Sequence, residues 1–239
     1  MKPVVLVESV KISDGKELRL VQHDSDFSIK VNSAELMNSR MHGSEEALAR
    51  LACEEIKKFP DPKILMGGLG MGFTLRAALD VLPQKSQVMV AELIPAVVRW
   101  NQGVLAHLAR KPLTDRRVKI HETDVARMIQ EGKETYSAIL LDVDNGPESL
   151  FQKGNDRLYS KDGLRAAYHA LQNRGVLAVW SAVPARDFTR RLHAAGFTVK
   201  EIPVSARSGQ KAGGHHWIWL AKKHAPADPS KTSKPARRY

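Results

Sequence analysis

Short apolar runs alternate with amphipathic segments along most of the chain from residue 63 onwards. Five runs have the length of strands, and all of them except RVKIHE are largely apolar: ILMGG, QVMVAEL, RVKIHE, SAILLDV and GVLAVWSA. A helix is predicted after each of them, over residues 72–82, 95–109, 124–131, 162–173 and 185–195. Strands that are apolar throughout and alternate with helices are typical of a parallel sheet covered on both faces.

The two ends of the chain follow a different pattern. The runs FTVKEIPV and HHWIWLAKK are joined by the Gly- and Ser-rich SARSGQKAGG, which predicts an antiparallel hairpin at one edge of the sheet. Near the start, VVLVESV, ELRLVQHD and FSIKV predict short strands, with a turn at Ser13-Asp14-Gly15. A helix is predicted from an N-cap at Ser44 to about Lys58, with Glu45 and Glu46 in its first turn.

These patterns divide the chain into three predicted parts: a small β region over 1–45, an α/β domain over 46–223 and a basic tail over 224–239. The net charge is +11, and six Lys or Arg residues fall within the last eighteen positions. Because this tail has almost no apolar residues to bury, it is predicted to be disordered. A solvated tail is the expected role, and contact with nucleic acid is the less favoured alternative.

The composition bears on the cellular setting of the protein and on the kinds of covalent or metal site that it could form. No apolar run is long enough to span a membrane, and no membrane contact is expected. Cys53 is the single cysteine, which excludes an internal disulfide and a cysteine-based metal site. The nine histidines are scattered, so no metal is expected. A reducing, cytoplasmic setting fits these features.

The stretch KILMGGLGMGFTLRAAL places glycine at 67, 68, 70 and 72, between the first strand of the α/β pattern and its helix. In open α/β sheets, ligands bind beyond the carboxyl ends of the strands, beside such a turn. Glycine lets the backbone approach a ligand closely. A tight turn with close helix packing is the alternative interpretation. A dinucleotide pattern read from Gly68 would need glycine where Phe73 stands, and no P-loop lysine follows.

Acidic residues follow the next three strands of the pattern. Glu92 ends the second strand, twenty residues after Gly72, where a carboxylate can accept both hydroxyls of a ribose. Asp124 follows the third strand and could reach an adenine edge, although helix capping is the alternative. Asp142 ends the fourth strand, where it is a candidate base or a cap of the following loop. One acid after each of three strands predicts a nucleoside site.

The spacing G-x-G-x-G at 68, 70 and 72 resembles the first motif of the class I S-adenosylmethionine-dependent transferases. Within that superfamily, residues 63–182 resemble the spermidine synthases, which are polyamine aminopropyltransferases. Further segments carry the resemblance: TLR at 74–76, Pro95 after Glu92, Gly146-Pro147 after Asp142, LYS at 158–160, and RGVLAVWS. The resemblance implies a Rossmann-like class I methyltransferase fold: a mostly parallel seven-stranded α/β sheet with helices on both faces, an antiparallel C-terminal hairpin and a short N-terminal β segment.

The resemblance also implies roles, position by position. Glu92 becomes the ribose partner, Asp124 the adenine partner and Asp142 the catalytic residue. The nucleoside loop consists of Gly67, Gly68, Gly70 and Gly72. The implied cofactor is S-adenosylmethionine or its decarboxylated form, the implied acceptor is a small amine, and a homodimer is implied as well.

The chain departs from the family pattern at several positions. Gly70 stands where the family's loop carries an aspartate, and Ser44 stands where it has a tyrosine. Asn145 replaces a second aspartate, for which Asp144 is the candidate substitute. Ordinary methyltransferases carry an acid where Met66 stands. The missing loop acid favours intact cofactor, hence methyl transfer, whereas the resemblance favours aminopropyl transfer, and both remain open.

Two other functions remain as alternatives to a small-amine transferase: an RNA or DNA methyltransferase, suggested by the basic tail, and a non-catalytic nucleoside-binding protein. Trp217 and Trp219 share one face of the last strand and are expected in the core. Tyr159 and Trp180 are candidates for the acceptor side of the site.

Overall fold

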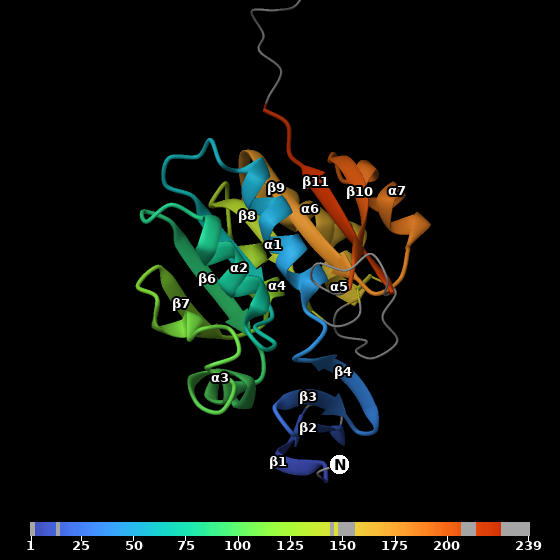
Figure 1. Cartoon of the computed structure of the whole chain (residues 1–239). Helices are drawn as coiled ribbons and strands as arrows, with labels where there is room; N and C mark the ends of the chain where they lie inside the picture. The colour runs from blue at the N-terminus through green and yellow to red at the C-terminus, as the bar shows by residue number, and fades with distance from the viewer. Residues whose placement is uncertain (1–2, 13–14, 144–145, 148–155, 207–213, 226–239) are drawn as a thin grey trace, which may run out of the picture.

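The computed structural model describes residues 3–12, 15–143, 146–147, 156–206 and 214–225. A seven-stranded sheet with helices on both faces forms the larger part, and a four-stranded sheet built from the N-terminal residues lies at one end of it (Figure 1). Most of the predicted basic tail lies outside the described residues, as do Ser13 and Asp14 of the predicted turn.

The larger sheet has the strand order β10-β11-β9-β8-β5-β6-β7. Neighbours from β9 through to β7 pair in parallel, whereas β11 pairs antiparallel with both β9 and β10. The predicted fold class and the antiparallel edge hairpin are therefore confirmed. The strands are β5 (Lys63–Gly67), β6 (Gln87–Glu92), β7 (Val118–Glu122), β8 (Tyr136–Leu141), β9 (Leu171–Ser181), β10 (Thr198–Ser205) and β11 (His215–Lys222).

The helices divide between the two faces of this sheet. Those whose buried residues share the first hydrophobic cluster are α1 (Gly43–Glu55), α2 (Phe73–Val81) and α3 (Pro95–Gln102). Those of the second cluster are α4 (Val125–Glu131), α5 (Asp156–Tyr159), α6 (Lys161–Ala170) and α7 (Arg186–Ala194). A short 3₁₀ turn, η2, covers Pro112–Thr114. No helix in the described part of the chain has the length and apolar character needed to cross a membrane.

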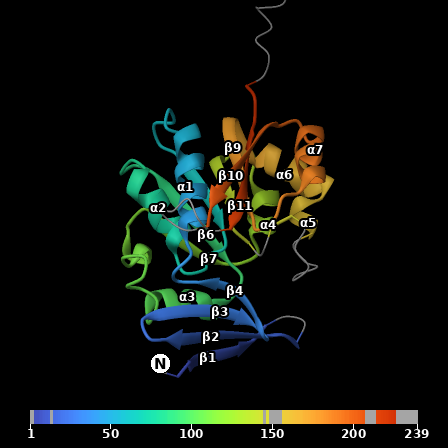
Figure 2. The same ribbon diagram turned by 45° about the vertical axis from the view of Figure 1, so that its right-hand side comes forward.

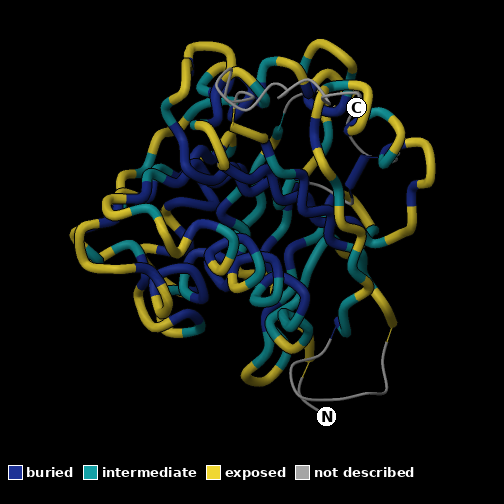
Figure 3. Tube along the Cα trace, turned by 90° about the horizontal axis from the view of Figure 1, so that it is seen from above, coloured by how far each residue is buried: buried dark blue, intermediate teal, exposed yellow. Residues whose placement is uncertain are grey.

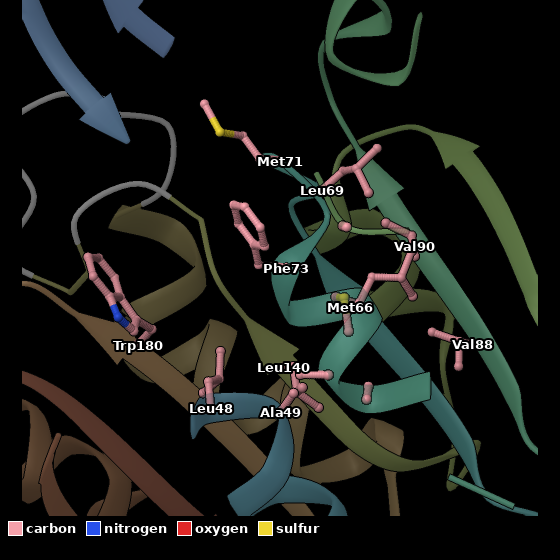
Figure 4. Packing of buried hydrophobic residues seen from close by; sticks show 14 of the residues in the cluster. Leu48, Ala49, Met66, Leu69, Met71, Phe73, Val88, Val90, Leu140 and Trp180 are labelled. Atoms are coloured by element: carbon pink, nitrogen blue, oxygen red, sulfur yellow. The ribbon is translucent and has the colours of Figure 1, made fainter. Parts of the chain in front are cut away.

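Alternation along β5, an inner strand of the sheet, explains the two clusters. Ile64 and Met66 belong to the first cluster, whereas Leu65 between them belongs to the second. Figure 4 shows Met66 near Leu140 of β8, within the cluster that α1 covers. Seen from above, buried residues occupy the middle of the molecule and exposed ones its outline (Figure 3). The sheet therefore supplies a rigid base for the loops at its edge.

Several predicted boundaries are wrong. The helix expected over 95–109 ends at Gln102, because Gly103 follows and the chain continues in turns. Residues 171–173, expected at the end of a helix, begin β9 instead. Helix α1 begins at Gly43 with His42 as its N-cap, so Ser44 lies inside the first turn and does not cap the helix.

The N-terminal sheet is a four-stranded antiparallel meander in the order β1-β2-β3-β4. Its buried residues, among them Leu20 and Phe27, join the first cluster of the larger domain. Figure 2 shows the small sheet below the larger one, with β4 nearest to it. Its strands are β1 (Val5–Lys11), β2 (Glu17–His23), β3 (Asp26–Val31) and β4 (Ala34–Asn38), the last of which was not predicted.

Candidate active site

The glycine loop leaves β5 and enters α2 in a left-handed backbone conformation. The φ angles are +82° at Gly68, +52° at Gly70 and +83° at Gly72, a region that other residues rarely adopt. A Cβ atom at Gly68 would lie 2.5 Å from the backbone oxygen of Asp142. The loop thus fits tightly against the end of β8, so the tight-turn interpretation accounts for part of the glycine pattern.

Glu92, the last residue of β6, connects this loop to β6 by hydrogen bonds. Its carboxylate accepts hydrogen bonds from the backbone N–H of Leu69, at 2.9 Å, and from that of Ile94, at 2.8 Å. The side chain is only 6% exposed. Glu92 also lines the cavity beside the glycine loop.

Asp124 is the N-cap of α4, where its carboxylate accepts a hydrogen bond of 2.8 Å from the backbone N–H of Ala126. The capping role that the sequence offered as an alternative is therefore real. Asp124 also lines the cavity beside the glycine loop, so it remains placed to meet a ligand.

Asp142 follows β8 at the centre of the sheet. The hydroxyl of Thr74 donates a 2.5 Å hydrogen bond to its carboxylate. Burial raises the pKa of Asp142 from 3.8 to about 6, and the hydrogen bond from Thr74 opposes part of that rise. A carboxylate with a pKa near neutrality is better suited to take a proton than an ordinary aspartate.

Glu45, in the first turn of α1, is the acid that the sequence analysis missed. It is 7% exposed, and the hydroxyl of Ser44 donates to its carboxylate at 2.7 Å. Burial, and then the charge of Asp142, raise the pKa of Glu45 to about 7. An acid in a first turn usually serves the helix dipole at the surface, so nothing in the pattern marked this one as buried.

These side chains line one cavity. Its lining residues are Leu18, Ile29, Leu36, Met37, Glu45, Gly68, Gly70, Ala91, Glu92, Leu93, Ile94, Val97, Thr123, Asp124, Val125, Asp142, Val143 and Trp180. Four of them come from the N-terminal sheet, which therefore forms one wall. Of the two aromatic candidates, Trp180 lines the cavity, whereas Tyr159 lies in the second hydrophobic cluster. Asp144 and Asn145 lie outside the described residues.

The sequence analysis also placed Trp217 and Trp219 in the core and expected no metal. Trp219 is fully buried, and Trp217 packs against the same cluster, as expected for one face of β11. Within the described residues, no three His, Cys, Asp or Glu side chains gather in a way that could hold a metal ion.

Comparison with known proteins supports the predicted resemblance. No family model matches the chain. A polyamine aminopropyltransferase of Saccharolobus solfataricus is 26% identical over 162 residues, which are 67% of this chain and 52% of that protein. The match thus spans about half the length of this curated relative.

Solved structures extend the likeness to nearly the whole chain. A spermidine synthase in complex with the transition state analogue AdoDATO aligns with a TM-score of 0.72 and 19% identity, over 98% of this chain and 80% of that one. The chain has a spermidine synthase-like fold. The spermidine synthase of Thermotoga maritima aligns equally widely, with a TM-score of 0.71 and 18% identity. A CurJ carbon methyltransferase aligns with a TM-score of 0.54 and 14% identity, over 76% of this chain and 54% of that one.

Within this spermidine synthase-like fold, the apolar side chain of Met37 lies beside Gly70, the position where the resemblance implies an acid. A Cβ atom at Gly70 would lie 2.7 Å from Cε and 3.0 Å from Sδ of Met37, on β4. An aspartate at this position would need Met37 to move. The thioether of Met37, from the N-terminal sheet, therefore occupies the space that a side chain at position 70 would need.

Ser44, where the resemblance implies a tyrosine, makes a different set of contacts. It is fully buried, and besides its bond to Glu45 its hydroxyl lies 2.8 Å from Nδ1 of His216, on β11. The ring of His216 meets that of Trp180 edge-on, with centroids 4.8 Å apart. Ser44 and His216 therefore lie behind two residues that line the cavity, Glu45 of α1 and Trp180 of β9.

The buried carboxyl of Glu45 predicts a pH dependence of stability. Because its pKa rises from 4.5 to about 7 on folding, the folded chain keeps a proton that the unfolded chain releases. Stability from this group is fully present below pH 4.5 and is lost as pH rises through 7. We expect Glu45→Gln to be more stable than the parent by about 2 to 3 kcal/mol at pH 8, with little difference at pH 4.5.

Urea unfolding at several pH values between 4.5 and 8 would measure this difference. Glu54→Gln is the matched control, because Glu54 lies exposed on the same helix and pairs with Lys57. Parallel pH curves for the parent and Glu45→Gln would show that Glu45 ionises freely in the folded state.

Proposed function

We propose that this chain is a transferase that binds S-adenosylmethionine or its decarboxylated form and transfers an alkyl group to a small amine. The observation that carries the proposal is the placement of Asp142, buried beside the glycine loop and hydrogen-bonded to Thr74, in a cavity that Glu92 and Asp124 also line. The fold comparisons support it, since spermidine synthases and a methyltransferase share this frame.

The residues present fit an adenosyl group. The loop backbone at Gly68 and Gly70 has no side chains to keep a ligand away, and both glycines line the cavity. In the proposed complex, Glu92 accepts the ribose hydroxyls and Asp124 meets the adenine. These roles are the ones that the resemblance implies.

The proposed reaction is an in-line displacement at a carbon bonded to a positively charged sulfur. The amine lone pair forms the new C–N bond while the C–S bond breaks and its electron pair stays on sulfur, leaving a neutral thioether. The proton of the amine goes to the carboxylate of Asp142. Because the reaction needs no other chemical group, holding the two reactants in line supplies much of the rate.

The first candidate for the transferred group is aminopropyl, which the matched aminopropyltransferase and the acidic character of the cavity favour. The second candidate is methyl, which one specific observation favours. Gly70 has no carboxylate to bind the amine end of a decarboxylated cofactor or to repel the carboxylate of the intact one, and Met37 fills that space.

Calorimetric titration with three ligands would test the proposal: 5′-methylthioadenosine, S-adenosylmethionine and its decarboxylated form. We expect all three to bind, and the tighter of the two sulfonium compounds to be the substrate. Incubation of that compound with a panel of alkylamines should then yield an alkylated amine and a thioether. Absence of binding by all three ligands would reject the adenosyl site, and binding without product would favour a non-catalytic protein.

A further inference from the structure

We propose that Asn101 of α3 is a positioning residue of the adenosyl site, which holds the carbonyl of Gly70 towards the helix and keeps the glycine loop in the conformation that a ligand meets. This role rests on the proposed function and adds a residue to the same site. Asn101 itself is not among the described residues that line the cavity, whereas Gly70 is one of them. Asn101 therefore acts on a ligand only through the backbone of the loop.

The side-chain amide of Asn101 joins α3 to the glycine loop. Its nitrogen, Nδ2, donates to the carbonyl oxygen of Gly70 at 2.8 Å and to that of Val97, one turn earlier in the same helix, at 2.9 Å. An amide NH₂ group has two N–H donors, so one hydrogen bond fixes the side chain against its own helix and the other holds the loop. Asn101 is only 1% exposed, so bulk water does not compete for either bond.

The amide oxygen of Asn101 indicates that the residue does more than fill space. This atom, Oδ1, is buried and accepts no hydrogen bond from the described residues. It would lie 3.1 Å from a Cβ atom at Gly72, so it packs closely against a second glycine of the loop. A buried acceptor without a donor costs stability, and a leucine of similar shape would avoid that cost. The two N–H groups are therefore what an asparagine contributes at this position.

Gly70 needs such a bond because its backbone is free to turn. It has a φ angle of +52° and no side chain, so several backbone conformations are open to it at little cost. In a planar trans peptide, the carbonyl of Gly70 and the N–H of Met71 point in opposite directions and rotate together. Without its donor, the carbonyl would turn towards another partner, and Gly70 borders the cavity. A carbonyl that turned into the cavity would take space from an adenosyl ligand.

The start of the glycine loop is held by other bonds. The N–H of Gly68 donates to the oxygen of Ala91, and the N–H of Leu69 donates to the carboxylate of Glu92. Both acceptors belong to β6. Loss of the amide from α3 should therefore change the peptide that follows Gly70 and leave the start of the loop in place. The expected effect is on ligand affinity more than on the fold.

The N-terminal sheet fixes α3 and so gives the amide a firm support. The residue before Asn101 is Trp100, which is 3% exposed and whose indole N–H donates to the carboxylate of Glu8, on β1, at 2.6 Å. Arg99 pairs with the same carboxylate at 2.8 Å. The hydrogen bond from Trp100 lowers the pKa of Glu8 from its ordinary value of 4.5, so this carboxylate is charged at neutral pH. The small sheet therefore supports the loop through α3.

The experiment is calorimetric titration of 5′-methylthioadenosine into the parent, Asn101→Ala and Asn101→Asp, at pH 5 and at pH 8. We expect Asn101→Ala to weaken binding about tenfold at both pH values, because the carbonyl of Gly70 loses its donor. Asn101→Asp should bind at least as weakly at pH 8, where the introduced carboxylate has no proton to donate. At pH 5 its affinity relative to the parent should recover, because burial raises the pKa of the introduced carboxyl and its O–H then donates in place of the amide.

Ser137→Ala is the matched control. Ser137 is fully buried, donates to the side chain of Gln172 at 3.0 Å and accepts from the N–H of Lys63 at 3.2 Å. It lies near the start of β8, at the other end of the strand from Asp142. This variant loses buried hydrogen bonds away from the loop, so it should lower the stability that urea unfolding measures and leave the affinity unchanged.

Parent-like binding by both Asn101 variants at both pH values would make Asn101 a merely structural residue, while the adenosyl site would stand. If the parent does not bind 5′-methylthioadenosine, the proposed function fails, and amide hydrogen exchange of the unliganded proteins decides the positioning role. The N–H of Met71 should then exchange about tenfold faster in Asn101→Ala than in the parent, with that of Leu69 unchanged. Equal exchange at Met71 would overturn the role. Should Asn101→Ala not fold, Asn101→Asp at the two pH values decides.

Discussion

Asp142→Asn is expected to lower kcat for alkyl transfer about a thousandfold, with 5′-methylthioadenosine binding unchanged. The amide has nearly the same shape as the carboxylate and can still accept the hydrogen bond from Thr74, so the loop should keep its geometry. It cannot take the proton of the amine. With a pKa of about 6, the parent carboxylate is available as a base at neutral pH.

Single-turnover rates across pH 5 to 9 would measure this effect. The parent rate should rise through the titration of Asp142, and the residual rate of the variant should lack that rise. Asp187→Asn is the matched control, because Asp187 lies exposed on α7 and pairs with Arg190. A variant with unchanged kcat and a raised KM would instead assign Asp142 to substrate binding.

Gly68→Ala is expected to destabilise the fold by about 4 kcal/mol, whereas Gly15→Ala should cost about 1 kcal/mol. Both glycines have left-handed backbones, with φ of +82° at Gly68 and +70° at Gly15. At Gly15 an added Cβ meets nothing within 4 Å, so only the backbone conformation is penalised. At Gly68 the added atom also lies 2.5 Å from the backbone oxygen of Asp142.

This contact cannot relax easily, because backbone hydrogen bonds hold both the glycine loop and Asp142 in place. The N–H of Gly68 donates to the oxygen of Ala91, and the N–H of Asp142 donates to that of Gly67. Urea unfolding of the parent and the two variants would measure the difference. Equal losses for the two variants would mean that the loop is free to move away from β8, and the close approach would then have no energetic weight.

The alternating pattern predicted the larger sheet well, because strands that are apolar throughout and regular helices leave a period in the sequence. The edge of the sheet that carries the candidate site was predictable for the same reason. Glu92 ends a strand, Asp124 and Asp142 each come after one, and parallel strands bring their carboxyl ends to one edge of the sheet.

What the pattern missed depends on contacts between distant segments. Glu45 and Ser44 meet His216 and the cavity only after α1 packs on the sheet, and no local signal marks that packing. Strand β4 is short and only partly buried, so its alternation is weak. Its residue Met37 reaches Gly70 across a separation in sequence that local reasoning does not cover.

The position of β11 has a consequence for the order in which the protein can be completed during synthesis. Although β11 is made after all the other described strands, it lies inside the sheet, between β9 and β10. Until it leaves the ribosome, β9 keeps an open edge and Ser44 lacks the imidazole that it meets in the finished chain. A nascent chain that already contains the glycine loop and Asp142 would therefore still expose the unpaired edge of β9 until β11 has been made.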